Sequence, residues 1–522
     1  MGPGLATEVL VLGCGIGGGV AALTLADAGV PVTVVTRAEN ATESNTYYAQ
    51  GGIIYRGAGD SPDLLAEDIR RAGAGLCHVP AVRIAATEGP ALVERILVDR
   101  VGVPFDRDAS HALSLAREGS HSVSRVAHVA DATGQAISAA LVGVLRDHPN
   151  VSLLTARTAV ELATPAQHSR DRLSVYAPAS CAGAYVLDQA RQQVICCQAR
   201  HTILATGGLG QIFLRTSNPA GARGDGFALA RRAGARVVNM EFVQFHPTTF
   251  FHDGAARFLV SEAVRGAGAR LVTADGRPFM DRYAPEWKDL APRDIVARAI
   301  HHEMRSHDLA NVYLDLRSYL PADRIKERFP NIHRDCLAYG VDMTRDLVPV
   351  VPAAHYACGG VWADEWGRTS LDRLYAVGEV SCTGLHGANR LASASLLEGL
   401  VWGYRAAQNI LRDRADGRAW QPGDLRPWED LGREPAEPAL VSQDTVTIRQ
   451  IMWSYVGLVR TTRGLARAVS ELGHLEREIG DFYATATLTD DLVGLRSSAQ
   501  TALMVAEAAR ANTRSAGCHY RE

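Results

Sequence analysis

The glycine-rich stretch GCGIGG at residues 13–18 has the spacing of a site that binds the pyrophosphate of a dinucleotide. It follows an apolar segment and precedes one rich in Ala and Leu, so it falls between a predicted strand and a predicted helix. Glycines there let the backbone approach the phosphates, and N–H groups of the first helical turn can donate to them. The ribose-binding residue stays open, because Thr36 and Arg37 end the second strand and Glu39 lies two residues after Arg37.

Two further strand ends carry glycines of the same kind, ILATGG at 203–208 and YAVGEV at 375–380. Glu379 in the second of them offers a carboxylate to ribityl hydroxyls. The polar loop SNTYYAQGG at 44–52 follows the second strand and would face the same crevice with its hydroxyls and backbone amides. Three such segments around one crevice favour FAD over NAD as the cofactor.

Two arginines are placed as binding groups rather than as surface charges. Arg390 lies in GANRLAS, among small residues that leave room for a ligand. Arg293 follows Pro292 in the first turn of a predicted helix, where a cation opposes the helix dipole. A guanidinium donates two parallel hydrogen bonds to a carboxylate, so both arginines suit an acidic ligand. His246 and His355, judged on their own residues, fit a structural role as well as a ligand role.

Residues 8–12 and 31–36 read as buried strands and residues 17–28 as the helix between them, which makes a βαβ unit. Further buried strands are predicted at 151–155, 201–205 and 373–377. Because these strands are spread over about 370 residues of sequence, we expect a sheet assembled from discontinuous segments, with a second domain inserted between them.

The predicted fold class is α/β, with a Rossmann-like FAD-binding domain, an inserted α+β capping domain and a C-terminal three-helix bundle. Apolar residues at three- and four-residue spacing predict the three helices, within VTIRQIMWSYVGLVR, TRGLARAVSELGHLEREIGDFY and DDLVGLRSSAQTALMVAEAARAN. The predicted domains are the FAD-binding domain at 1–237 and 351–415, the capping domain at 238–350, a Pro-rich linker at 416–440 and the helical domain at 441–522.

The composition of the 522 residues excludes several partners. The 54 Lys+Arg nearly balance 57 Asp+Glu, for a net charge of -3, so neither nucleic acid nor an anionic membrane is expected as a partner. The nine cysteines form no CxxC pair and no zinc spacing, which predicts a reducing compartment and no metal site. The first residues lack the pattern of a signal peptide, so we expect a cytoplasmic location.

In addition to the glycine-rich stretch, eight segments occur in the order typical of one flavoprotein family: YAQGG (48–52), DATG (131–134), LATGG (204–208), NPAGARGDG (218–226), FHPT (245–248), PRDIVARAI (292–300), HYACGG (355–360) and HGANRLASASLLEG (386–399). The sequence thereby resembles the fumarate reductase and succinate dehydrogenase flavoproteins, from residue 8 to the last helices. The resemblance implies that FAD is contacted by Gly13, Cys14, Gly15, Ile16, Gly17, Gly18, Arg37, Asn45, Thr46, Tyr47, Tyr48, Ala49, Gln50, Gly51, Gly52, Asp225, Glu379, Ser395 and Leu396.

The resemblance also implies a site for a dicarboxylate in front of the flavin. Its two carboxylates would be held by His246, His355, Arg390 and Ser261. Ser261 and Glu262 stand where the family usually has Thr-Glu, and the serine keeps the hydroxyl donor. Arg293 and Glu118 would orient the substrate for hydride transfer. Arg293 is a poor free base, since its pKa lies above roughly 12, so it would bind a carboxylate or, in the reverse reaction, donate a proton through a relay.

Glu118 decides which substrate the resemblance implies, because a carboxylate beside the site pairs with an α-ammonium group. The family members that oxidise L-aspartate carry Arg-Glu-Gly here. The implied reaction is FAD-dependent oxidation of L-aspartate to iminoaspartate, with O2 (giving H2O2) or fumarate as acceptor, the first step of NAD biosynthesis. Implied partners are quinolinate synthase, transiently, or a second copy of the chain. Ser120, Val123 and Ala394 depart from the family's common residues.

Three alternatives remain beside this interpretation. A soluble fumarate reductase or a succinate dehydrogenase-type flavoprotein would share most of the motifs, although members with covalent FAD bind it through a histidine where this chain has Asn45. An oxidase of another amino dicarboxylate would explain the departures around Glu118. A flavoprotein without turnover would be expected to have lost the arginines or histidines of the substrate site, and all four are present.

Overall fold

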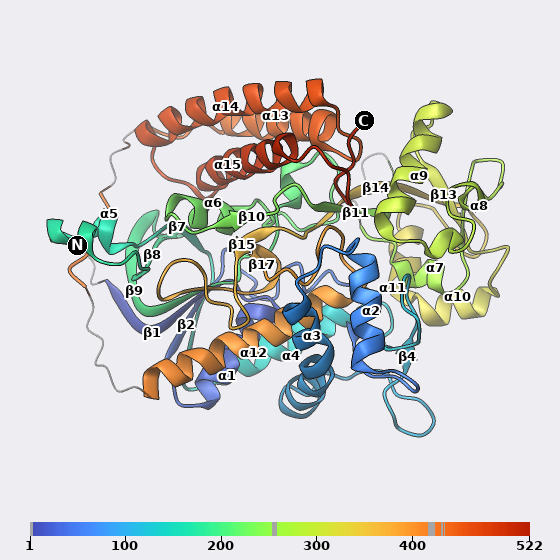
Figure 1. The fold of residues 1–522 in the computed structure, drawn as a ribbon, viewed down its shortest axis with the longest axis horizontal. Helices are drawn as coiled ribbons and strands as arrows, with labels where there is room; N and C mark the ends of the chain where they lie inside the picture. The colour runs from blue at the N-terminus through green and yellow to red at the C-terminus, as the bar shows by residue number, and fades with distance from the viewer. Residues whose placement is uncertain (1–3, 253–257, 416–422, 430–431, 433) are drawn as a thin grey trace.

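The computed structural model describes residues 4–252, 258–415, 423–429, 432 and 434–522. Its largest sheet has seven strands in the order β6-β2-β1-β9-β8-β7, with β16 also paired to β9 (Figure 1). These strands are β1 (Leu5–Leu12), β2 (Val32–Val35), β6 (Val151–Leu154), β7 (Arg157–Leu162), β8 (Gly183–Asp188), β9 (Gln193–Leu204) and β16 (Leu374–Ala376). The sheet therefore joins segments from five separate stretches of the chain.

The strands that carry the cofactor motifs are parallel, which confirms the predicted βαβ unit. Val9 pairs with Val32 across β1 and β2, and Leu12 pairs with Leu204 across β1 and β9. Residues 9–12 are almost completely buried. Such a continuous apolar run is typical of a parallel strand covered on both faces, and it aligns the carboxyl ends of β1, β9 and β16 at one edge.

Helices α1 (Ile16–Asp27) and α12 (Ala394–Ala415) pack against each other with almost touching backbones. Glycine makes this possible, because a Cβ atom on Gly403 would lie 2.4 Å from the carbonyl oxygen of Gly17. On another side, α4 (Thr133–Asp147) packs so closely that a Cβ on Gly19 would meet Leu141 at 2.6 Å. The close packing fixes the start of α1 at the carboxyl edge of the sheet.

A second sheet, at the right in Figure 1, has the antiparallel order β11-β14-β13-β12 and its own hydrophobic core. Its strands are β11 (Val243–Phe250), β12 (Arg270–Val272), β13 (Val312–Asp315) and β14 (Val348–Ala357). The helices around it are α7 (Glu262–Gly266), α8 (Met280–Tyr283), α9 (Arg293–Ser306), α10 (Ala322–Arg328) and α11 (Pro330–Leu337). This is the α+β unit expected between the halves of the main sheet; its exact domain boundaries stay a prediction.

Two small sheets connect the larger units. The first has the order β10-β15-β17, formed by β10 (Val237–Val238), β15 (Gly360–Trp362) and β17 (Ser381–Cys382). The second has the order β3-β5-β4, formed by β3 (Ile53–Ile54), β5 (Val126–Ala127) and β4 (Leu115–Ala116). The β3-β5-β4 sheet brings the loop that contains Glu118 next to the loop at 44–52. Helices α2 (Pro62–Ala72) and α3 (Val79–Leu92) lie nearby, and a π-helical turn, Val93–Arg100, continues α3.

The three predicted C-terminal helices are confirmed as α13 (Pro438–Val456), α14 (Thr462–Thr485) and α15 (Asp490–Ala511). Thr461 and Thr489 cap α14 and α15 by accepting hydrogen bonds from backbone N–H groups of their first turns. The bundle shares its core with the main sheet and packs on α6 (Asp225–Arg232). Of the predicted linker, residues 416–422, 430, 431 and 433 lie outside the described residues. Within the described part, no helix has both the length and the apolar character needed to cross a membrane.

Candidate active site

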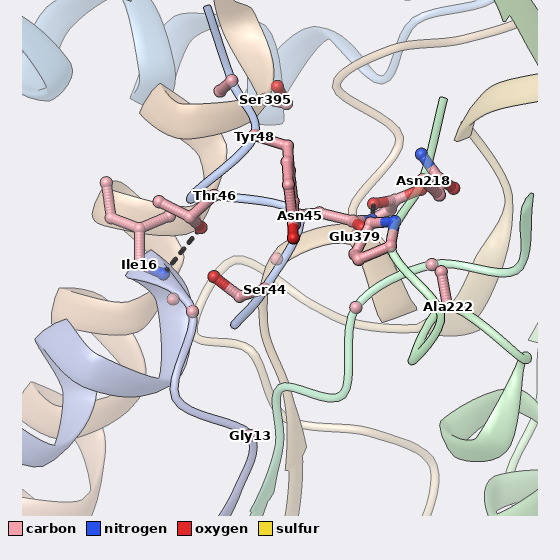
Figure 2. A pocket seen from close by; sticks show the side chains of 18 of the residues that line it. Gly13, Ile16, Ser44, Asn45, Thr46, Tyr48, Asn218, Ala222, Glu379 and Ser395 are labelled. Carbon is pink, nitrogen blue, oxygen red and sulfur yellow. Dashed lines mark hydrogen bonds between the residues drawn. The ribbon is translucent and has the colours of Figure 1, made fainter. Parts of the chain in front are cut away.

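One cavity collects both sets of predicted site residues. It lies at the carboxyl edge of β1, β9 and β16, and residues of β11 and β14 from the antiparallel four-stranded sheet also line it. Every predicted cofactor residue except Tyr47 lines it, and so does every predicted substrate residue: Glu118, His246, Ser261, Glu262, Arg293, His355 and Arg390. Figure 2 shows part of the predicted cofactor end, with Gly13, Ile16, Asn45 and Glu379 around one space.

The glycine-rich turn leaves the start of α1 open to a ligand. Gly13 has φ +114°, and a Cβ on it would lie 2.1 Å from the carbonyl oxygen of Ala205, so only glycine fits where β1 and β9 end. The N-cap Gly15 has no side chain to cap the helix, and the first turn has no acidic residue. The N–H of Ile16 donates to Thr46 Oγ1 at 3.0 Å, which ties the loop at 44–52 to the helix start (Figure 2). A phosphate is the ligand such a helix start favours.

Glu379 is buried at the far side of the same space. Its carboxylate accepts hydrogen bonds from the side-chain amide of Asn45 and, at 3.1 Å, from the backbone N–H of Ala357. It also lies directly against Gly208, where a Cβ would meet Oε1 at 2.2 Å. Burial raises the pKa of Glu379 to about 7, because the charged form loses its water. The carboxyl group is therefore poised to change charge near neutral pH.

The FAD-free protein should lose stability as pH rises from about 4.5 to about 7. In this window folded Glu379 keeps a proton that unfolded Glu379 releases, so deprotonation opposes folding, by about 3 kcal/mol in total. We expect Glu379→Gln to remove this part of the pH dependence. The measurement is the urea midpoint of both FAD-free proteins at about pH 5 and about pH 8. Equal pH slopes for the two proteins would contradict the prediction.

Within the cofactor end, the cavity wall that contains Arg37 and Asp225 lies against the helical bundle. Arg37 forms an ion pair with Asp490 of α15 at 3.0 Å. Arg223 bonds both Asp225 and Asp490, again at 3.0 Å. Thr158 also donates to Asp490, at 2.6 Å. A cluster of charges from three parts of the chain therefore closes this end.

Several buried polar atoms that line the cavity have no hydrogen-bond partner among the described residues. At the cofactor end these are Gln50 Oε1, Thr206 Oγ1 and Asp225 Oδ1. Buried polar atoms are nearly always paired in folded proteins, so unpaired ones facing a cavity indicate a polar ligand. A flavin dinucleotide fits this end, because its hydroxyls can use the oxygen acceptors and its pyrophosphate suits the start of α1.

The two predicted arginines meet at the other end of the cavity with unequal partners. Arg293 donates from Nε to Glu262 at 2.6 Å and from Nη1 to Gln244 Oε1 at 3.2 Å. Arg390 donates to Ser395 Oγ at 3.0 Å and stacks 4.6 Å from the ring centre of Tyr356, but its buried Nε has no partner in the described structure. Burial and the nearby charge of Arg293 lower the pKa of Arg390 to about 10. An anion would relieve this repulsion.

The two histidines are neighbours because β11 pairs with β14, and their ring centres lie 5.0 Å apart. The N–H of Thr248 donates to His246 Nδ1 at 3.2 Å, so the ring proton is on Nε2. That buried Nε2 has no acceptor among the described residues, although it lines the cavity. Ser217 Oγ lies 2.7 Å from His355 Nδ1. Burial lowers the pKa of both histidines well below 6.5, so they act as neutral hydrogen-bonding groups.

Two buried carboxyl groups, Glu262 and Glu118, lie beside these cations, and their pKa values shift in opposite directions. Burial raises the pKa of Glu262, but the guanidinium groups of Arg293 and Arg265 outweigh it and hold the pKa below the usual value. Burial and the charge of Glu262 raise the pKa of Glu118, whose Oε2 accepts a hydrogen bond from Ser393 at 2.6 Å. Of the two, Glu262 forms an ion pair with Arg293, whereas Glu118 forms none among the described residues.

The loop that carries Glu118 is fixed by a buried ion network. Arg125 pairs with Asp60 at 2.9 Å and with Asp68 at 2.7 Å, and all three side chains are fully buried. The N–H of Ser122 donates to Asp68 at 2.8 Å. Ser120 has φ +64°, the left-handed region that favours glycine. A serine therefore holds a backbone conformation that glycine adopts more readily.

At the substrate end, the polar residues Ser217, Gln244, Tyr356 and Ser393 are among those that were not predicted from the sequence. Gln244 is fully buried and connects the two arginines, since it accepts from Arg293 and donates to the backbone oxygen of Arg390 at 2.8 Å. Its position two residues before His246 on β11 places both side chains on one face, which was a usable signal. Ser217 and Ser393 reach the site from irregular segments, where no periodicity predicts direction.

Comparison with known proteins agrees with this geometry. Residues 8–396 match the model of an FAD binding domain, and residues 446–522 match that of the fumarate reductase flavoprotein C-terminus. The chain is 45% identical to L-aspartate oxidase 1 of Ralstonia nicotianae over 517 residues, covering 98% of this chain and 94% of the relative. It is 42% identical to L-aspartate oxidase of Pseudomonas aeruginosa, with the same two coverages. A solved structure of E. coli quinol fumarate reductase FrdA superposes with a TM-score of 0.88 at 26% identity, covering 99% of this chain and 91% of that one.

Fold and cavity together define a flavoprotein that uses FAD, with the architecture of the fumarate reductase flavoproteins. Within that class, identity of 39–45% over nearly the full length decides the branch. The chain belongs to the L-aspartate oxidase family.

Proposed function

We propose that this protein oxidises L-aspartate to iminoaspartate with FAD, as the first step of NAD biosynthesis. The observation that carries the proposal is the pair of buried arginines at one end of the cavity, of which Arg390 lacks a counter-anion within the described residues. A buried charge without a partner is costly, and a dicarboxylate ligand removes that cost. When bound, FAD supplies the hydride acceptor.

The chain's own residues bind and orient the substrate. Arg390 and the Nε2–H of His246 donate to one carboxylate or both, and His355 adds a further hydrogen-bonding group. Ser261 Oγ accepts from the N–H of Ala263 at 3.2 Å, which leaves its hydroxyl proton for the ligand. Arg293, held by Glu262, contributes the second guanidinium. Positioning by several fixed donors is the protein's share of the rate enhancement.

Glu118 supports an amino acid as the substrate rather than succinate. Burial and the charge of Glu262 raise its pKa although Arg293 and Arg390 act in the opposite direction, and Glu118 forms no ion pair among the described residues. An α-ammonium group would supply a cationic partner and stabilise the carboxylate, so the substrate's amine and Glu118 gain from each other. Fumarate and succinate offer no such charge, and the alternative of a fumarate reductase or succinate dehydrogenase-type enzyme is therefore less favoured.

The proposed electron acceptors are O2, which yields H2O2, and fumarate, which fits the same dicarboxylate site. Iminoaspartate is unstable in water, so we infer transient contact with quinolinate synthase in the cytoplasm.

The proposal is tested by anaerobic mixing of the holoenzyme with L-aspartate, D-aspartate or succinate while the flavin absorbance is followed. L-aspartate should bleach the flavin, and the other two should leave it oxidised or react far more slowly. Bleaching by succinate but not by L-aspartate would refute the proposed substrate.

The flavin should be held without a covalent bond. Asn45 lines the cofactor end, donates to Glu379 and offers no nucleophile to the flavin ring. We therefore expect acid precipitation of the holoenzyme to release all the flavin into the supernatant, as measured by absorbance. Yellow colour retained by the washed pellet would show a covalent bond.

A further inference from the structure

The segment at residues 515–522, called here the brace, follows α15 and runs from the bundle to the substrate end of the cavity. In Figure 1 the chain terminus lies between the bundle and α9. The brace is anchored by the fully buried Arg460, whose Nη1 donates to His519 Nδ1 at 2.6 Å. His519 therefore carries its proton on Nε2, which lies 3.0 Å from the carbonyl oxygen of Asn512.

The brace contacts the segment that carries Arg390. The N–H of Cys518 donates to the carbonyl oxygen of Ala388 at 2.9 Å, and its thiol donates to Asn389 Oδ1 at 3.2 Å. Gly517 has φ +50°, and a Cβ on it would lie 2.5 Å from the Ala388 oxygen. The backbones of the brace and of the segment before Arg390 are therefore in direct contact.

The brace also contacts the helix that carries Arg293. Arg298, one turn further along α9, donates to the carbonyl oxygen of Gly517 and to Asp294, both at 2.9 Å. Asp294 in turn accepts from Asn389 Nδ2 at 3.2 Å. These bonds form a closed ring from the brace to α9, from α9 to Asn389, and from Asn389 back to the brace.

The side-chain amide of Asn389 has both its oxygen and its nitrogen occupied by two hydrogen bonds each. Its Oδ1 accepts from Gln244 at 2.7 Å and from Cys518, and its Nδ2 donates to Ala72 at 2.9 Å and to Asp294. A buried amide with all partners in place holds one orientation. The residue immediately before Arg390 is thereby fixed to α2, α9, β11 and the brace at once.

We propose that the brace is a positioning element of the substrate site, which joins α9 to the segment before Arg390 and so sets the separation of Arg293 and Arg390. The proposal rests on the proposed function, which has these two arginines hold one dicarboxylate. None of the brace residues lines the cavity. A displaced brace should therefore weaken dicarboxylate binding without changing the contacts to FAD.

The test is Gly517→Ala, compared with Gly234→Ala. Both glycines have positive φ, but Gly234 has open space around its Cβ position, so the pair separates backbone strain from the collision with Ala388. The ligand is malonate, a dicarboxylate that cannot be dehydrogenated, and its Kd is read from the flavin spectrum of the holoenzyme. We expect Gly517→Ala to raise this Kd about tenfold or more, with the Kd of FAD unchanged and KM for L-aspartate affected more than kcat.

Equal malonate Kd values for the two alanine variants would overturn the proposal. Arg298→Met provides a second variant in case Gly517→Ala folds poorly, since it removes the bond from α9 to Gly517 at a partly exposed position. It should also raise the malonate Kd, and an unchanged value would count against the brace. If wild-type protein bound malonate but failed to oxidise L-aspartate, the proposed function would fail while the comparison of variants stayed valid.

Discussion

Replacing Arg390 by Met should lower kcat/KM for L-aspartate by about a thousandfold, without lowering the melting temperature of the FAD-free protein. The loss of activity follows from losing charge-assisted hydrogen bonds to a carboxylate, each worth about 1.5–3 kcal/mol. Stability should not fall, because the charge of Arg390 is unfavourable in the folded state. Burial and the charge of Arg293 lower its pKa to about 10, so keeping Arg390 charged costs free energy in the folded state, and Met removes this cost.

The measurement is steady-state kinetics together with thermal unfolding of the FAD-free variant. Arg412→Met is the matched control, since Arg412 also stacks on an aromatic ring, 4.3 Å from the centre of Trp366, but does not line the cavity. It should keep full activity. A large fall in melting temperature for Arg390→Met would show that Arg390 is structural, and unchanged kinetics would remove it from the substrate site.

The second large effect is expected for Glu118→Gln, which should lower kcat/KM for L-aspartate by about a hundredfold or more. Glutamine keeps the shape and the hydrogen bond with Ser393 but cannot balance an ammonium charge. Binding of malonate, which has no amine, should be unchanged or tighter, because one negative charge is gone from the site. The variant thus separates recognition of the amine from recognition of the carboxylates.

Glu118 should also determine the acidic side of the pH profile. Because the pKa of Glu118 is raised, the carboxylate that pairs with the ammonium group forms at higher pH than for an ordinary glutamate. We therefore expect kcat/KM for L-aspartate to increase as the pH rises through the pKa of Glu118. The Gln variant should lose this rise, in kinetics measured over the same pH range. Equal losses of L-aspartate oxidation and malonate binding would instead mean that Glu118 supports the site as a whole.

Much of the fold could be predicted because the decisive signals are local. The apolar runs at β1, β2 and β9 are buried on both faces, and the glycine turn after β1 permits one conformation that other residues cannot adopt. The three last helices follow from apolar spacing. What local patterns could not give is strand order, such as the pairing of β16 with β9, which depends on contacts between distant segments.

The site divides in the same way. Arg390 and Arg293 were recognisable from their neighbours and from helix position, whereas the histidines needed the resemblance to other flavoproteins. Asn389 acts through buried hydrogen bonds to residues more than 90 positions away, so nothing beside it in the sequence marks its role, whereas Gln244 could have been found from its place two residues before His246. Tyr47 was expected in the cofactor set with its neighbours, but it is not among the residues that line the cavity.

The ion pair between Arg37 and Asp490 has a consequence for how the protein matures. The two residues are 453 positions apart, yet their bond closes one end of the FAD cavity. A ribosome adds residues in order, so the earlier segments of the main sheet emerge long before α15 can complete that end. Contacts of such long range form late in folding. The flavin should therefore be held firmly only once α15 has been synthesised and packed, rather than when the glycine-rich turn after β1 first emerges.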